Sequence, residues 1–171
     1  MELIYQVITQ PGEADYRAYA KAHIKCRSGR RPVLSILVGV ALIATAVIPW
    51  ARMGFSPLYI ITLAIGLGCL FADAISLRVL QNKLLAGLPA TPIRQEYRFD
   101  AAGFQLRYQG QKKMHSYSDL AQALDSQDHY FLYLDRNMAY ILPKADFAQG
   151  DAASFAAFLR EKGVALMQLK L

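Results

Sequence analysis

Three histidines are the side chains of this sequence best suited to bind a metal or transfer a proton. His23, His115 and His129 are scattered along the chain, and no His-Glu-x-x-His motif is present. A catalytic or zinc-binding histidine needs further ligands or partners at short, defined spacing. We therefore predict no metal site, no cofactor and no catalytic residue, and interpret the histidines as surface or half-buried polar positions.

The two cysteines and the serines also form no pattern typical of a metal site or a catalytic nucleophile. Cys26 and Cys69 are too few for a four-cysteine zinc site or a disulfide scaffold. Cys69 lies within an apolar run, where a cysteine behaves as a small hydrophobic residue. No serine stands in a Gly-x-Ser-x-Gly motif. We expect the protein not to be an enzyme.

Two uncharged runs of 18 residues each, 33–50 and 55–72, dominate the first half of the chain. At 1.5 Å per residue each helix would be about 27 Å long, close to the hydrocarbon core of a bilayer at about 30 Å. The rest of the chain is too short to wrap two helices that are apolar on every face. The segment 32–89 is thus predicted to be a transmembrane helical hairpin in the lipid bilayer. Its spans are about 33–50 and 55–73, and its second helix continues to about residue 86.

Charges flanking the two spans predict their orientation. Basic residues precede the first span, including Lys25, Arg27, Arg30 and Arg31, and others follow the second, whereas the short turn 51–54 holds only Arg52. Lys and Arg gather on the cytoplasmic side of membrane proteins, so both termini are expected in the cytoplasm. Trp50 stands where an interfacial aromatic residue is expected.

Asp73 is the carboxylate next to this apolar stretch, and ionisable groups inside membranes are often functional. It stands at the cytoplasmic end of the second span, level with Arg30 and Arg31. We expect an interfacial ion pair with these arginines. An intramembrane enzyme or ion pathway centred on Asp73 is a further hypothesis, but such a pathway would need more than one ionisable group.

Small residues recur four apart in both spans. Lipid gives helices no hydrophobic reason to associate, so small side chains that permit close backbone contact mark packing faces. These could join the two helices to each other, which we expect, or to a second copy of the protein. They are Ser35 and Gly39 in the first span, and Ala64, Gly68 and Ala72 in the second.

The net charge of +6 is concentrated near the spans, with +3 in residues 1–32, +2 in 33–89 and only +1 in 90–171. The basic residues before the first span are placed to contact anionic headgroups, at about 1 kcal/mol for each residue. Because the C-terminal half is almost neutral, we do not expect nucleic acid to be a partner.

The regions outside the spans predict an α+β protein. Residues 1–31 read as a strand, 2–8, followed by an amphipathic helix, and we expect the strand to join the sheet formed by 93–142. Residues 90–171 read as short strands followed by an amphipathic helix, 151–162, with Phe155, Phe158 and Leu159 on one face. We expect a small antiparallel sheet, curled like a barrel and closed by the C-terminal helix.

The stretch Tyr117-Ser118-Asp119-Leu120, the strands at 130–133 and 140–142, and the Ile-Leu-Pro-Lys ending at 144 before Phe147 resemble the YcxB-like family. The resemblance implies a bacterial plasma (inner) membrane protein with two spans and a C-terminal domain similar to pleckstrin-homology (PH) folds. It implies no catalytic residues.

Two functions are compatible with these features. The first is a membrane-anchored, non-enzymatic protein whose cytoplasmic domain binds a protein, a peptide or a lipid headgroup. The second is an accessory or regulatory subunit of a membrane enzyme or transporter that packs through the hairpin. A homo-oligomer is compatible with both.

Overall fold

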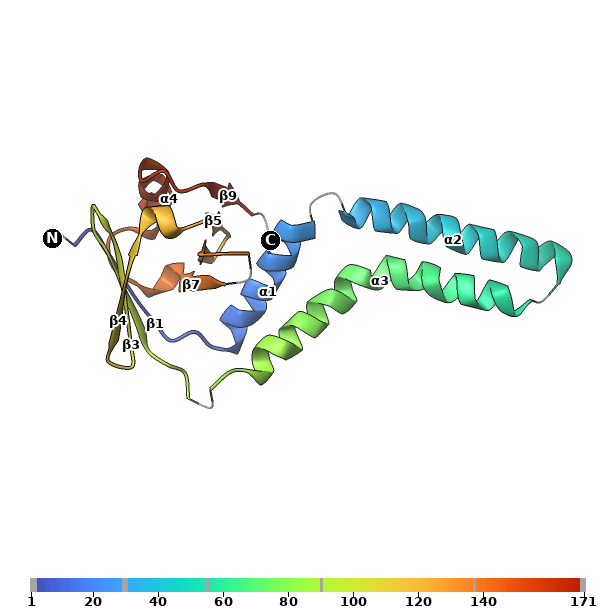
Figure 1. The fold of residues 1–171 in the computed structure, drawn as a ribbon, viewed down its shortest axis with the longest axis horizontal. Helices are drawn as coiled ribbons and strands as arrows, with labels where there is room; N and C mark the ends of the chain where they lie inside the picture. The colour runs from blue at the N-terminus through green and yellow to red at the C-terminus, as the bar shows by residue number, and fades with distance from the viewer. Residues whose placement is uncertain (1–2, 29–30, 55, 90, 137, 170–171) are drawn as a thin grey trace. The chain divides into compact units, whose positions relative to one another are not determined.

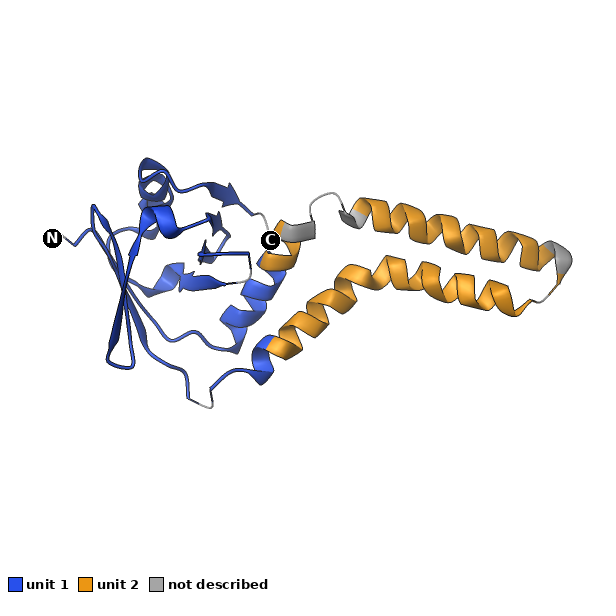
Figure 2. Cartoon of the chain, in the orientation of Figure 1, with its two compact units in different colours: residues 1–22, 84–171 blue, residues 23–83 orange. Residues whose placement is uncertain are grey.

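The structure, a computed structural model, describes residues 3–28, 31–54, 56–89, 91–136 and 138–169 (Figure 1). The chain divides into two compact units (Figure 2). Unit 1 contains residues 1–22 and 84–171, and unit 2 contains residues 23–83. The N-terminal strand and the start of the first helix thus belong to the same unit as the C-terminal half of the chain.

Unit 1 contains a five-stranded antiparallel sheet, sheet A, with the strand order β4-β3-β2-β1-β8. The prediction that the N-terminal strand joins the later strands is confirmed, since Tyr5 pairs with Phe99 and Thr9 with Gln95. Residues alternate between buried and half-buried along β1, as expected for a strand with one face on a core. The strands are β1 (Tyr5–Thr9), β2 (Gln95–Phe99), β3 (Gly103–Tyr108), β4 (Gln111–Ser116) and β8 (Phe147–Gln149).

A second sheet, sheet B, has the order β7-β6-β5-β9. The fold class is α+β as predicted, but the expected single barrel-like sheet is not found: among the described residues the strands form two separate sheets, neither of them closed. Sheet B is also mixed, because β9 runs parallel to β5. Its strands are β5 (Gln122–Asp125), β6 (His129–Tyr133), β7 (Ala139–Pro143) and β9 (Leu166–Gln168), and short 3₁₀ turns occupy Tyr117–Asp119 and Lys144–Asp146.

The C-terminal helix α4 (Ala152–Glu161) completes the core of unit 1, as its amphipathic pattern predicted. Asp151 caps its first turn by accepting a hydrogen bond from the Ala153 backbone N–H. Phe155, which is fully buried, places its ring 5.1 Å from Tyr5 and 4.9 Å from Phe99, measured between ring centroids. The helix therefore closes the end of the core that contains this row of aromatic rings.

Helix α1 (Glu13–Ser28) begins in unit 1 and covers part of sheet B. Tyr19 is buried, with its ring centroid 5.9 Å from that of Phe131 on β6. Asp15 accepts a hydrogen bond from the Gly12 backbone N–H and lies 2.9 Å from Nε2 of His129. These contacts fix the first turns of α1 on the sheet.

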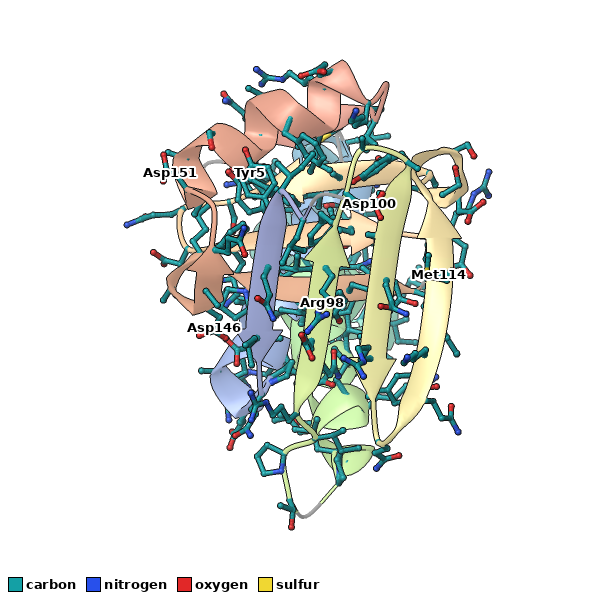
Figure 3. All side chains as sticks on the ribbon, turned by 90° about the vertical axis from the view of Figure 1, so that its left-hand side faces the viewer. Tyr5, Arg98, Asp100, Met114, Asp146 and Asp151 are labelled. Atoms are coloured by element: carbon teal, nitrogen blue, oxygen red, sulfur yellow. The ribbon has the colours of Figure 1, made fainter. Side chains whose placement is uncertain are left out.

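The outer face of sheet A is polar, and Figure 3 looks onto it. Glu96 accepts hydrogen bonds from Gln6 and from Arg98, and Met114 on β4 is 60% exposed. Side chains on opposite faces of these strands therefore have opposite character, apolar toward the core and charged toward solvent.

Unit 2 consists mainly of two long apolar helices, α2 (Arg31–Met53) and α3 (Pro57–Ala86), which together are called the apolar hairpin below. Residues 51–53, expected in the turn, are the last residues of α2. The helix ends at Gly54, whose φ of 86° is a conformation that glycine adopts at low cost. The continuation of the second helix to residue 86 agrees with the prediction.

Candidate functional site

The two helices of the apolar hairpin come into close contact at a pair of glycines, Gly39 and Gly66. A Cβ atom on Gly39 would lie 2.9 Å from the backbone oxygen of Gly66, and a Cβ on Gly66 would lie 3.0 Å from the oxygen of Gly39. Both distances are shorter than a methyl group tolerates. The backbones can therefore meet here only because neither residue has a side chain.

The other small residues chosen from the sequence do not share this contact equally. A Cβ atom on Gly68 would meet no atom within 4 Å, and Ala64 is exposed as well, whereas Ser35 and Ala72 are partly buried. Sequence reasoning identified Gly39 but missed its partner Gly66. The four-residue spacing marked the row of Ala64 and Gly68, which faces away from α2.

Most of the hairpin surface is apolar and exposed. Both helices are long and apolar enough to cross a membrane, and only 11% and 6% of their apolar windows are buried. A core helix of a soluble domain would instead be mostly buried. Trp50, in the last turns of α2, is 43% exposed, and Arg52 follows it in the same helix.

The charged residues at the other end of the hairpin are described only in part. Asp73 is exposed on α3, and Lys25 is exposed on α1. Arg30 lies outside the described residues, as do the side chains of Arg27 and Arg31. The predicted ion pair between Asp73 and these arginines therefore stays a prediction.

Two of the three histidines make contacts that explain their positions. His115 stacks on Phe104 and lies 2.9 Å from the Tyr140 hydroxyl, which links β4 of sheet A to β7 of sheet B. His129 contacts Asp15, as described above, and His23 is half-buried on α1. In the part of the chain that the structure describes, no three His, Cys, Asp or Glu side chains are grouped as metal ligands would be.

A cavity lined by several polar groups lies in unit 1, between the two sheets. The cavity has a volume of about 220 Å³ and lies between the inner face of sheet A, strand β7 and the start of α1. We call it the tyrosine pocket because four tyrosines line it: Tyr16, Tyr97, Tyr108 and Tyr140. Tyr97 pairs with Leu106, and Leu106 with Lys113, so these three residues form one inward-facing row. The row containing Phe99, which α4 covers, is the next one along the strands.

The phenol groups of the tyrosine pocket are close together and uncharged at neutral pH. The Tyr97 and Tyr140 rings are 5.5 Å apart, and the Tyr97 hydroxyl donates a hydrogen bond to Oε1 of Gln95. Burial raises the pKa of Tyr97, and the neighbouring phenols of Tyr140 and Tyr16 raise it further. Burial also raises the pKa of Tyr140, and Lys113 partly opposes this effect. The hydroxyls of Tyr97 and Tyr140 are thus already bonded within the protein, to Gln95 and His115, which leaves those of Tyr16 and Tyr108 as donors for a ligand.

Two more polar side chains accompany these phenols. The ammonium group of Lys113 lies over the Tyr108 ring, 5.5 Å from its centroid. Thr9, opposite Gln95 on β1, is buried, and its hydroxyl has no hydrogen-bond partner among the described residues. An unpaired buried hydroxyl is costly, so polar atoms beside this cavity are not fully satisfied by the protein itself.

Sequence reasoning did not find the tyrosine pocket. The aromatic residues of the strands, Tyr108 and Tyr140 among them, were interpreted from the sequence as core and cross-strand packing, which is correct for the buried Tyr130 and Phe131. Lys113 gave no signal, because both faces of β4 are polar and its alternation does not reveal which face is inward. The register with Leu106 is what shows that Lys113 points to the inner side.

Comparison with known proteins gives one match. The family model described as YcxB-like protein matches residues 99–159, which extend from the end of β2 to α4. No curated protein and no solved structure matches the chain. The resemblance seen in the sequence is confirmed for this segment: residues 99–159 match the YcxB-like family model, and two helices long and apolar enough to span a membrane precede them.

Proposed function

We propose that this chain is a membrane-anchored, non-enzymatic binding protein. Its apolar hairpin crosses the bacterial plasma membrane twice, both termini lie in the cytoplasm, and unit 1 is a PH-like domain held at the cytoplasmic surface. The tyrosine pocket is the binding site of that domain.

The observation that carries this proposal is the outward-facing apolar surface of α2 and α3. Large side chains such as Leu37 and Val79, each 62% exposed, project from both helices, and charges are almost absent between residues 33 and 72. Water would solvate such a surface poorly, at about 25 cal/mol for each Å² of apolar area, whereas lipid chains would cover it. The length of each helix suits a bilayer.

The PH-like assignment is supported by the order of the elements in unit 1. The strands β1 to β4 form one antiparallel meander and β5 to β7 a second, and α4 follows them and covers one end of the core. The apolar hairpin is inserted between the first and second strands of this arrangement. The pocket faces the end that α4 does not cover.

Extraction and reporter experiments test the anchoring. The full chain expressed in a bacterium is expected to remain in the membrane pellet after alkaline carbonate washing and to need detergent for release. A reporter inserted after Gly54 should be active only as a periplasmic enzyme, and reporters at either terminus only as cytoplasmic ones. Release by carbonate, or a cytoplasmic reporter at Gly54, would contradict the proposal.

One observation favours the alternative function, an accessory subunit that packs through the hairpin. Gly68 is open on the surface of α3 and does not contact α2, so another helix could approach it. In that case Gly68→Leu would abolish co-purification of a partner subunit while leaving the chain itself folded in the membrane. For a lone anchor the same substitution should have no effect.

A further inference from the structure

The charged part of the tyrosine pocket lining is positive. Lys113 is the only charged side chain that lines it in the described part of the chain, and no carboxylate does. Two carboxylates are adjacent in sequence to lining residues. Glu96 points to the opposite face of sheet A and pairs there with Arg98. Asp15, which adds to the effect of burial in raising the pKa of Tyr16, is bonded to His129 and to the Gly12 N–H. A ligand in this pocket would therefore meet one positive charge and no negative one.

The neutral phenols add donors to this charge. The hydroxyls of Tyr16 and Tyr108 line the pocket as neutral donors, whereas those of Tyr97 and Tyr140 are already bonded to Gln95 and His115. Hydrogen bonds from a neutral hydroxyl and from an ammonium group to a carboxylate are stronger than bonds between neutral groups. The polar groups of the pocket thus suit an oxyanion.

The apolar lining residues and the volume of the cavity restrict which molecule could present that oxyanion. Leu106, Met138 and Ile141 supply apolar surface beside the four aromatic rings. The volume of about 220 Å³ is below the range of roughly 300–1,000 Å³ common for drug-sized ligands. One aromatic ring or a short acyl chain fits, and a whole phospholipid does not.

We propose that the tyrosine pocket binds a small apolar monocarboxylate. The carboxylate lies near Lys113 and accepts hydrogen bonds from the hydroxyls of Tyr16 and Tyr108, and the apolar body packs among the rings and against Met138. This inference rests on the proposed function, in which the pocket is the binding site of a non-enzymatic domain. It goes further by naming the ligand class.

The test uses the full chain in nanodiscs of neutral phosphatidylcholine, with 3-phenylpropionate as the probe and its uncharged amide as the comparison. Isothermal titration is expected to show saturable binding of the acid and at least tenfold weaker binding of the amide. Lys113→Met, which keeps most of the apolar stem, should weaken binding of the acid at least tenfold. Lys112→Met is the matched control, because the adjacent Lys112 lies on the outer face of the sheet, opposite Arg107 on β3, and it should leave binding unchanged.

Three results would overturn the inference: no saturable binding of the acid, equal affinity for acid and amide, or equal losses in the two lysine variants. Thermal unfolding of both variants should match the parent chain, which shows that any loss of binding arises at the site. The carbonate extraction tests the membrane-anchoring proposal independently of ligand binding. A chain released by carbonate refutes the membrane function whatever the pocket binds, and a chain that stays in the membrane without binding the probe refutes only the ligand.

Discussion

Replacing Phe155 by alanine is expected to lower the free energy of unfolding of unit 1 by about 3–5 kcal/mol, the cost typical of removing a fully buried phenylalanine. Its ring is fully buried and contacts Tyr5, Phe99 and Tyr130 at centroid distances of 5.1, 4.9 and 5.2 Å. The loss thus affects both sheets and α4 together. For a domain whose total stability is about 5–15 kcal/mol, this is a large fraction.

Urea unfolding of the full chain in nanodiscs, followed by near-ultraviolet circular dichroism of the tyrosines, measures this effect. Phe71→Ala is the control, since it makes the same chemical change at a side chain on α3 that is 57% exposed. It should leave the unfolding of unit 1 unchanged. If Phe155→Ala cost no more than the control, α4 would not be docked on the core as described.

The second large effect concerns the apolar hairpin. Gly39→Ala places a methyl group 2.9 Å from the Gly66 oxygen and 3.0 Å from the Leu70 side chain, so the two helices must move apart. Overpacking of this kind costs about 1–3 kcal/mol. Gly68→Ala adds the same methyl group where nothing lies within 4 Å and should be neutral or slightly stabilising, because alanine favours helix over glycine by about 1 kcal/mol.

Unfolding of the hairpin by increasing dodecyl sulfate in mixed micelles separates the two variants. Trp50, the only tryptophan of the chain, reports on the end of α2 by its fluorescence. The midpoint should fall for Gly39→Ala and stay or rise for Gly68→Ala. Equal midpoints would mean that Gly39 and Gly66 are not in close contact in the micelle.

The elements that follow strong local patterns could be predicted from the sequence. The two apolar helices and α4 were correct, the latter because Asp151 supplies a cap and the apolar residues recur at helical spacing. The prediction that the N-terminal strand joins the sheet of the later strands was correct because an alternating strand needs a sheet to join.

Features decided by long-range contacts could not be predicted. Strands β5 and β9 are four and three residues long, too short for alternation to be visible, and β5 pairs with β6 and β9 rather than with β4, so the expected single sheet is two. A helix that is apolar all round gives no sign of which face packs, so Gly66 was missed in favour of Gly68. The tyrosine pocket depends on the register that brings Lys113 beside Leu106 and on the placement of β7 opposite them.

The insertion of the apolar hairpin between β1 and β2 has a consequence for biosynthesis. When the ribosome has completed β1, its hydrogen-bonding neighbours at 95–99 and 147–149 have not yet been made. Strand β1 stays unpaired while both long helices are translated. Pairing strands that lie so far apart in sequence is slow, because closing the intervening segment costs entropy. Completion of sheet A is thereby ordered after synthesis of both apolar helices, so a chain that ends before residue 95 leaves β1 without a neighbouring strand.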